Sequence, residues 1–175
     1  MAEDSELWNR ICRGDAQAFD AFYRQMAPPL LGFLRQIVGT RQAAEDVLQE
    51  TFAHMWRSPN GFTPEKGTLR AYLFGVARKC AAEWWRKRGS IGGNPIEASA
   101  ESKTELVSLV DDALQHLPEQ QRTLLWLREV EGQSYAELAQ ILDIPVGTVR
   151  SRLFTAREEL RMVWHATRPA RKEGA

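Results

Sequence analysis

Residues 134–157 read SYAELAQILDIPVGTVRSRLFTAR, and the two halves of this segment show separate helical patterns. Ser134 and Glu137 have the spacing of a capping box, which starts a helix. The segment 143–147 ends that helix, because proline disfavours helical geometry in the residue before it and glycine frees the backbone. The first apolar stripe comprises Leu138, Ala139, Ile141 and Leu142, and the second comprises Val149, Leu153, Ala156, Leu160 and Val163.

The opposite face of the second helix carries side chains suited to DNA. Arginine, serine and threonine can bond base edges, and an exposed phenylalanine can touch a thymine methyl group. The predicted base-reading residues are Arg150, Ser151, Phe154 and Thr155, and the predicted phosphate contacts are Arg152, Arg157 and Arg161. A solvated basic helix would show the same face by itself, but the capped helix and turn before it favour a helix-turn-helix. Nucleic acid is therefore the leading expected partner.

Composition excludes several classes of protein. The chain has 175 residues, which fits one domain or two small ones, and 43% of them are hydrophobic. It has neither an 18-residue apolar stretch nor a leader pattern, so we expect a cytoplasmic protein rather than a membrane protein. Cys12 and Cys80 are far apart, and no catalytic or metal-ligand spacing stands out. We therefore expect no enzyme, no metal, no cofactor and no small-molecule substrate.

The net charge is zero, but the charges are unevenly distributed. Residues 61–88 contain seven basic and two acidic side chains, whereas residues 89–131 contain three basic and eight acidic ones. Because attraction to phosphate acts over about 8 Å at physiological salt, the local sign of charge matters more than the total. Two separate contacts with DNA are therefore predicted.

The periodicity predicts an all-α fold of two small domains. Residues 89–103 are small and polar and read as a flexible linker. No alternating strand pattern competes with the helical ones. Helices are expected over 4–25, 28–38, 41–57 and 67–87 before the linker, and over 105–116, 119–131, 134–143 and 147–164 after it. Leu124, Leu125, Leu127 and Val130 are expected in the core of the second domain, while Trp126 suits either core or surface.

The helix expected over 41–57 gathers its apolar residues on one side. These are Val47, Leu48, Thr51, Phe52 and Met55. The far side holds Asp46, Gln49, Glu50, Ala53 and Trp56. An exposed tryptophan among polar residues is typical of protein interfaces. Burial of Trp56 under a neighbouring segment is equally compatible with the pattern.

The helix expected over 67–87 gathers aromatic and cationic residues toward its end. They are Arg78, Lys79, Trp84, Trp85, Arg86, Lys87 and Arg88. This mixture suits single-stranded or opened DNA, because bases stack on aromatic side chains while cations attract the backbone. A core tryptophan with a solvated basic helix end is the alternative. We expect one tryptophan inside and one available.

Four motifs in order resemble the sigma-70 family of bacterial RNA polymerase initiation factors, in particular the extracytoplasmic-function (ECF) type. They are AEDVLQETF at 44–52, LRAYLFGVARK at 69–79, LPEQQR at 117–122 and PVGTVRSRL at 145–153. The resemblance implies sigma region 2 over 1–88, a linker over 89–104, region 4 over 105–166 and a tail over 167–175.

The resemblance also implies roles for the matching residues. Asp46, Gln49, Glu50 and Trp56 look like the surface that docks on the clamp helices of the largest subunit of core RNA polymerase. Residues 61–68 and the basic helix, with Arg78, Lys79, Trp84, Trp85, Arg86 and Arg88, are similar to the part that captures a flipped base of the promoter −10 element. The second helix of the helix-turn-helix would read the −35 element. An anti-sigma partner, often membrane-bound, is implied as well.

Two residues depart from the family pattern. Lys79 stands where the family often has asparagine, and Thr155 where it often has arginine. A relative's promoter consensus therefore does not transfer to this chain. Two other functions fit less of the sequence: a stand-alone dimeric regulator leaves the 67–87 helix and Trp56 unexplained, and a nucleic-acid enzyme lacks a catalytic constellation.

Overall fold

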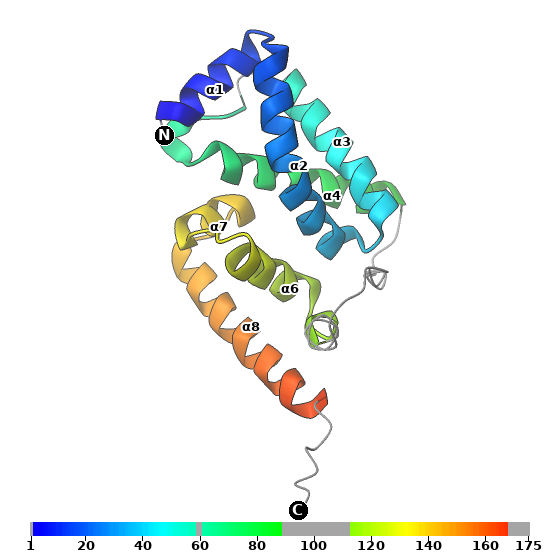
Figure 1. Ribbon diagram of the computed structural model, residues 1–175. Coiled ribbons are helices and arrows are strands. Elements are labelled where there is room, and N and C mark those ends of the chain that lie inside the picture. The colour runs from blue at the N-terminus through cyan, green and yellow to red at the C-terminus, as the bar shows by residue number, and fades with distance from the viewer. Residues whose placement is uncertain (1, 59–60, 89–112, 168–175) are drawn as a thin grey trace, which may run out of the picture.

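The computed structural model describes residues 2–58, 61–88 and 113–167, and all regular structure in these ranges is helical (Figure 1). The elements are α1 (Ala2–Cys12), α2 (Ala16–Val38), α3 (Arg41–Arg57), the 3₁₀ turn η1 (Pro64–Lys66), α4 (Leu69–Arg88), α6 (Glu119–Leu125), the π-helical turn η2 (Trp126–Val130), α7 (Tyr135–Leu142) and α8 (Val146–Thr167). The all-α prediction is confirmed. The expected linker, the expected helix before residue 113 and the tail from residue 168 lie outside the described residues.

The N-terminal helices differ from the prediction of helices over 4–25 and 28–38. The helix is interrupted at Gly14, which has a φ of 81°. Asp15 caps α2, because its side chain accepts hydrogen bonds from the amides of Gln17 and Ala18 at 3.1 and 3.0 Å. The α2 helix then continues through Pro28 and Pro29. Each proline lacks an amide donor. Burial on both sides of the prolines, at Ala18, Phe22, Met26, Leu30, Phe33, Leu34 and Ile37, outweighs the lost hydrogen bonds.

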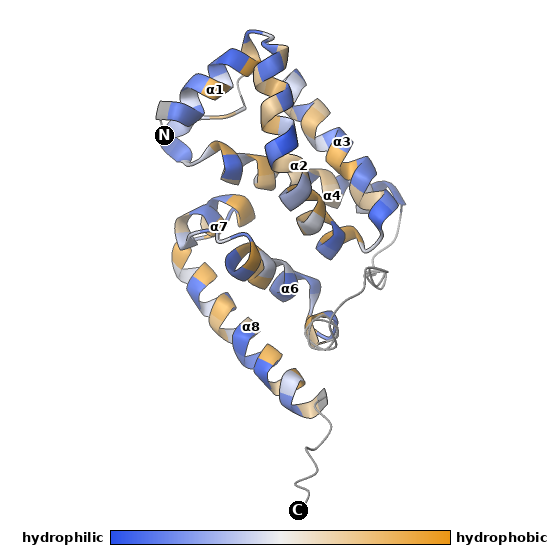
Figure 2. Cartoon of the chain, in the orientation of Figure 1, coloured by the Kyte–Doolittle hydropathy of each residue, from blue (hydrophilic) through white to orange (hydrophobic). Residues whose placement is uncertain are grey.

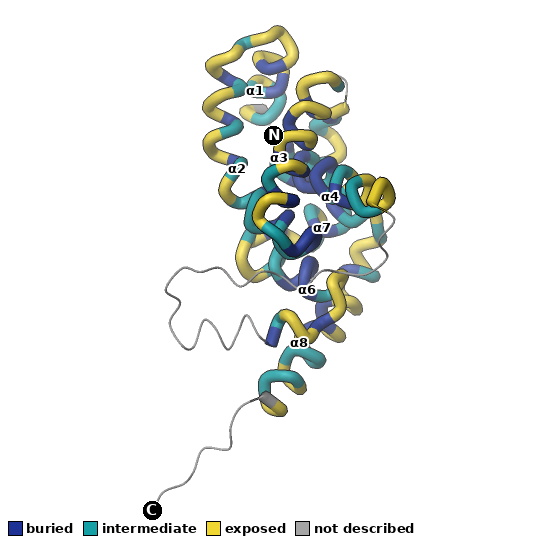
Figure 3. Tube along the Cα trace, turned by 90° about the vertical axis from the view of Figure 1, so that its right-hand side faces the viewer, coloured by how far each residue is buried: buried dark blue, intermediate teal, exposed yellow. Residues whose placement is uncertain are grey.

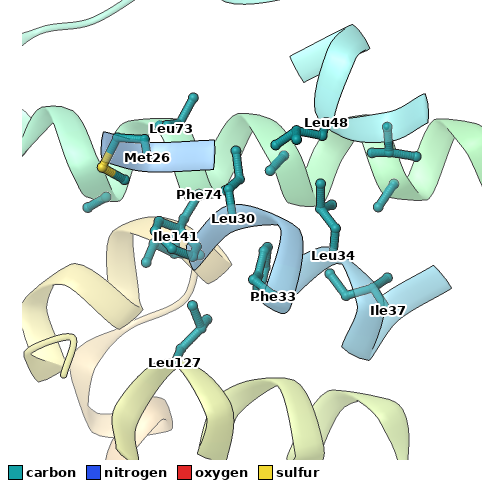
Figure 4. Packing of buried hydrophobic residues seen from close by; sticks show 14 of the residues in the cluster. Met26, Leu30, Phe33, Leu34, Ile37, Leu48, Leu73, Phe74, Leu127 and Ile141 are labelled. Carbon is teal, nitrogen blue, oxygen red and sulfur yellow. The ribbon is translucent and has the colours of Figure 1, made fainter. Parts of the chain in front are cut away.

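The hydrophobic core is continuous between the N-terminal helices and the C-terminal ones. Phe33 of α2 and Phe74 of α4 are fully buried, with ring centroids 5.1 Å apart. Leu127 and Ile141 from the C-terminal helices join the same buried cluster (Figure 4). Figure 3 shows buried segments concentrated around α4 and α7, which pack against each other. The two expected domains are therefore packed against each other along α4 and α7.

The C-terminal helices are only partly as expected. Leu124, Leu125 and Leu127 are buried, but Val130 is 58% exposed, so its placement in the core was wrong. The reason is η2, in which the Glu131 amide donates to the carbonyl of Trp126 five residues earlier. This wider turn rotates Val130 off the apolar stripe. Trp126 is half-buried.

The α8 helix extends away from the other helices, with hydrophobic and polar residues interspersed along its length (Figure 2). Val149, Leu153 and Ala156 are buried as predicted. Leu160 and Val163 are only half-buried, because the second half of the helix runs beyond the main cluster. The buried seam that orients α8 therefore lies in its first half.

Candidate nucleic-acid and polymerase interface

The helix-turn-helix forms as its local signals predict. The Ser134 hydroxyl accepts from the Glu137 amide at 3.2 Å, while the Ser134 amide donates to the Glu137 carboxylate at 2.8 Å. Asp143 ends α7 in the left-handed conformation, and α8 starts immediately after Pro145. This turn fixes which face of α8 points outward.

The predicted base-reading residues share the outward face of α8. Arg150, Ser151, Phe154 and Thr155 are all exposed, and Phe154 is 68% exposed. The two hydroxyls donate within the helix, from Ser151 to the Thr148 carbonyl at 3.1 Å and from Thr155 to the Ser151 carbonyl at 3.2 Å. Each hydroxyl oxygen keeps acceptor capacity for a base edge.

Sequence reasoning missed a ring that lies beneath Arg150. Tyr135 at the start of α7 has the guanidinium of Arg150 6.0 Å from its ring centroid and that of Arg128 5.0 Å from it. Arg128 also donates to the Gln133 carbonyl at 2.7 Å. Cation–π attraction therefore contributes to the placement of Arg150. Arg128 and Arg150 are well separated from Tyr135 in the sequence, so no local pattern predicted that they contact its ring.

The predicted phosphate contacts differ in their surroundings. Arg152 is exposed. Arg157 donates from Nε and Nη2 to one carboxylate oxygen of Glu129, at 3.2 and 2.7 Å, and this hydrogen bonding raises the pKa of Arg157. Arg161 pairs with Glu158 at 2.6 Å. Two of the three predicted phosphate contacts thus already have a carboxylate partner.

The basic end of α4 is built around the two tryptophans. Trp85 donates from its indole nitrogen to the Ile37 carbonyl at 3.4 Å, and Arg88 lies 4.1 Å from the ring centroid of Trp84. Both rings are half-buried, so the expectation of one inside and one available was wrong. Lys79, Arg86 and Arg88 are exposed. Of these cations, Arg88 lies directly over a tryptophan ring, and Arg86 lies 3.9 Å from the carboxylate of Glu83.

Arg78 does not lie free with these cations. It is half-buried, and its Nε donates to the Ile141 carbonyl of α7 at 3.0 Å. Thr68, from the predicted loop 61–68, and Arg70, which the predicted site did not include, also meet the C-terminal helices. Thr68 donates to Glu137 at 3.0 Å, and Arg70 donates to Glu131 at 2.6 Å. The opposite charges of segments 61–88 and 89–131 were the signal that could have indicated the pair of Arg70 and Glu131.

The outer face of α3 borders an apolar groove. Asp46, Gln49, Glu50 and Trp56 are exposed as predicted, and Glu50 pairs with Arg57 at 2.6 Å. Beside them the groove has a volume of about 460 Å³ and is lined mainly by Ala16, Phe19, Tyr23, Phe52, Ala53 and Trp56. Trp56 packs edge-on against Phe19 at 4.9 Å and remains 47% exposed. Trp56 is therefore partly packed against α2 and partly exposed, whereas the sequence left burial and exposure as alternatives.

Neither a disulfide nor a metal-type cluster occurs among the described residues. Cys12 is exposed and Cys80 is half-buried, and the two do not form a disulfide bond with each other. Within the described ranges, no cluster of three or more histidine, cysteine, aspartate and glutamate side chains has the arrangement of a metal site. None of the described helices is both long and apolar enough to cross a bilayer.

Comparisons with known proteins identify the family of this chain. Family models for Sigma-70 region 2 and for Sigma-70 region 4 match residues 22–91 and 108–160. The RNA polymerase sigma-H factor of Pseudomonas aeruginosa is 33% identical over 178 residues, covering 90% of this chain and 92% of the relative. The ECF RNA polymerase sigma-E factor of Haemophilus influenzae is 33% identical over 181 residues, covering 90% and 95%.

Solved structures share the fold. The sigma factor RpoE of Bartonella quintana, solved with the anti-sigma factor NepR, matches with a TM-score of 0.72 and 25% identity, covering 87% of this chain and 100% of that one. CnrH, solved with the cytosolic domain of CnrY, matches with a TM-score of 0.75 and 23% identity, covering 94% and 99%. The chain belongs to the sigma-70 family of RNA polymerase sigma factors, of the ECF type, and so to the transcription initiation factors that direct the polymerase to promoters.

Proposed function

We propose that this chain reads the promoter −35 element as duplex DNA through the outward face of α8. The observation that carries the proposal is the division of that helix. Val149, Leu153 and Ala156 are buried, while Arg150, Ser151, Phe154 and Thr155 project outward. A helix-turn-helix places such a face in the major groove, where these side-chain types discriminate bases. Arg152, Arg157 and Arg161 serve as phosphate contacts beside it.

The second DNA contact is the −10 element, bound as the strands separate. It involves residues 61–68 and the α4 residues Arg78, Lys79, Trp84, Trp85, Arg86 and Arg88. Support comes from the two half-buried indole rings near the end of α4 and from the exposed Arg88, which lies over one of them. A base taken out of the stack costs a few kcal/mol, and stacking on aromatic rings offsets that cost.

Core polymerase docks on the outer face of α3 in this proposal. Asp46, Gln49 and Glu50 supply polar contacts to the clamp helices of the largest subunit, and Trp56 supplies the apolar anchor. The groove between α2 and α3 supports this assignment, because a half-exposed tryptophan beside an apolar hollow is a typical centre of binding energy. The proposed functional division is sigma region 2 over residues 1–88, a linker over 89–104, sigma region 4 over 105–166 and a tail over 167–175. The chain acts in the cytoplasm and catalyses no reaction itself.

An anti-sigma factor is the remaining proposed partner. It is supported by the matching sigma factor from Bartonella quintana, which was solved bound to one. Affinity purification of the chain from its own host tests this partner. Recovery of fully active chain with no bound inhibitor, under every growth condition tried, argues against it.

Run-off transcription tests the promoter function. Purified core polymerase and the chain are incubated with fragments of the host genome, and specific start sites are expected only when the chain is present. Folded chain and active core that give no specific start would refute the proposal. The core-binding assignment is tested with Asp46→Ala combined with Gln49→Ala, which should weaken core binding without changing the helical content. Exposed substitutions on α1, Glu6→Ala with Asn9→Ala, are the control.

A further inference from the structure

The −10 loop, defined as residues 61–68 between α3 and α4, lies beside α1 (Figure 1). The structure describes each of its residues, and Phe62 alone among them is buried. The ring of Phe62 meets Trp8 of α1 edge-on, with the ring centroids 5.9 Å apart. Tyr72 of α4 completes the cluster, 5.7 Å from Phe62 and 5.9 Å from Trp8. The start of the loop is therefore held by one ring from α1 and another from α4.

The end of the loop is held by α1 as well. The amide of Leu69, the first residue of α4, donates to Asp4 Oδ2 at 3.1 Å. The first amides of a helix have no acceptor within the helix, and the helix dipole favours a carboxylate at this end. The Thr68 hydroxyl accepts from the Ala71 amide at 3.1 Å and is the local cap. Asp4 thus adds a second cap from 65 residues away along the chain.

Between these two anchors the loop passes close to Tyr72 and then makes a tight turn. A Cβ atom added to Gly61 would collide with the Tyr72 hydroxyl and would lie 3.1 Å from the carbonyl oxygen of Ser58. The turn η1 follows, and it contains no buried residue. Glu65 and Lys66 in this turn are exposed. The middle of the loop is therefore open to a ligand while both of its ends are held.

We infer that α1 is a positioning element for the −10 loop. Trp8 fixes where the loop begins by burying Phe62, and Asp4 fixes where it ends by capping α4. The exposed turn between the two anchors is thus held in one conformation before DNA arrives. This inference rests on the proposed function, in which the loop binds a flipped base of the −10 element. It gives α1 a role in that recognition although α1 itself does not touch the DNA.

Preorganisation is the reason why such anchoring affects base recognition. A loop that becomes ordered only on binding loses affinity to the entropy of ordering, and a loop held beforehand avoids this loss. A loop free to change shape also accepts a wrong base more readily, because discrimination depends on contacts held in a fixed geometry. Loss of one helix cap typically shifts an equilibrium about fivefold. We expect a change of this size in discrimination at the flipped base.

Four variants separate anchoring from general stabilisation. Asp4→Ala removes the remote cap from α4 and leaves the three rings intact. Asp4→Asn is the conservative variant, because its side-chain oxygen can still accept from the Leu69 amide. Glu3→Ala is the matched control, since it removes the same charge from an exposed neighbouring position of α1. Phe62→Leu tests the other anchor, because it keeps an apolar side chain but loses the ring contact with Trp8.

Recognition is measured with holoenzyme assembled from core polymerase and the full chain, well below the unfolding temperature of every variant. The probes are single-stranded oligonucleotides that carry the −10 element of a promoter found by run-off transcription, with and without a substitution at each base. Asp4→Ala and Phe62→Leu should reduce the ratio of matched to mismatched affinity about fivefold at the flipped base. Asp4→Asn should retain most of the ratio. Affinity for core polymerase and for the −35 duplex should change by no more than about twofold.

A merely structural role of α1 gives a different result. Asp4→Ala would then lower the melting temperature and leave the affinity ratio unchanged, which would overturn the inference. An equal change in the ratio for Glu3→Ala would also overturn it, because the effect would then belong to net charge. Hydrogen exchange tests the anchor directly: the Leu69 amide should exchange faster in Asp4→Ala than in Glu3→Ala.

The proposed function and this inference fail in different ways. If run-off transcription yields no promoter, the proposed function fails, while exchange at Leu69 still reports whether Asp4 holds the end of the loop. If promoters are found and transcribed but the affinity ratio does not respond to Asp4→Ala or Phe62→Leu, only the present inference fails.

Discussion

Arg150 lies over the ring of Tyr135, which favours one orientation of its guanidinium. An arginine that forks onto a guanine edge contributes about 1–3 kcal/mol of discrimination. We expect Arg150→Ala to weaken binding to duplex −35 DNA most where that guanine is present, measured by anisotropy across single-base variants of the site. Arg152→Ala should instead weaken all variants alike, as a phosphate contact does. An equal loss on every sequence for Arg150→Ala would contradict base reading.

Glu129 holds Arg157, so it should limit how strongly α8 attracts DNA. Both side chains are about half exposed, and such a surface pair contributes about 0–1 kcal/mol to folding. Glu129→Gln should therefore leave the melting temperature nearly unchanged while tightening duplex binding. The slope of log affinity against log salt should steepen by about one, because one more cation becomes free to meet a phosphate.

The control for Glu129→Gln is Glu6→Gln on α1, which makes the same change in net charge far from α8. If both variants tighten DNA binding equally, the effect belongs to net charge and not to release of Arg157.

Among the elements, α7 begins with a complete capping box, formed by Ser134 and Glu137. Burial raises the pKa of the Glu137 carboxyl, but hydrogen bonds from Ser134 and Thr68 outweigh this and hold the pKa below its usual value. The ionised carboxylate is thus favoured in the folded chain. Its contribution to stability is present above the unfolded pKa of about 4.3 and is lost as pH falls through the lower folded value.

Glu137→Gln keeps the hydrogen-bonding pattern of the capping box but cannot ionise. We expect the unmodified chain to be the more stable of the two at pH 7 and to lose this advantage below about pH 4. Thermal unfolding followed by circular dichroism from pH 7 to 3 measures the difference. A difference that stays constant over this range would contradict the role given to the charge.

The described helices before and after residues 89–112 share one core, so we expect the two halves of the chain to stabilise each other. Leu127 is fully buried, and truncation of such a residue costs about 2–5 kcal/mol. Leu127→Ala should lower hydrogen-exchange protection in α2 and α4 as well as in α6–α8. The matched control is Val130→Ala, three residues away on the same turn and exposed, which should change stability by no more than about 0.5 kcal/mol. Loss of protection confined to α6–α8 would show that the halves unfold independently.

Local patterns were sufficient for most of the helices and for the orientation of the candidate site. The capping box at Ser134, the turn before α8 and the buried side of α3 all follow from contacts within a few residues along the chain. The same holds for the outward face of α8, because three buried positions on one helix fix the direction of the rest. The break at Gly14 was also local, through its glycine and the Asp15 cap, but the apolar spacing on either side concealed it.

By itself, the sequence determined the all-helical fold, the helix-turn-helix and the residue types that face outward, because propensity, capping and periodicity act over short distances. Only the tertiary structure decided which of those residues already form hydrogen bonds with other parts of the chain. Arg78 meets a carbonyl 63 residues away and Arg157 a carboxylate 28 residues away. Such pairs depend on how helices dock, and docking is set by the summed burial of many side chains rather than by any local motif. For the same reason, no pattern in residues 134–157 showed that the apolar side of the helix-turn-helix rests on α4.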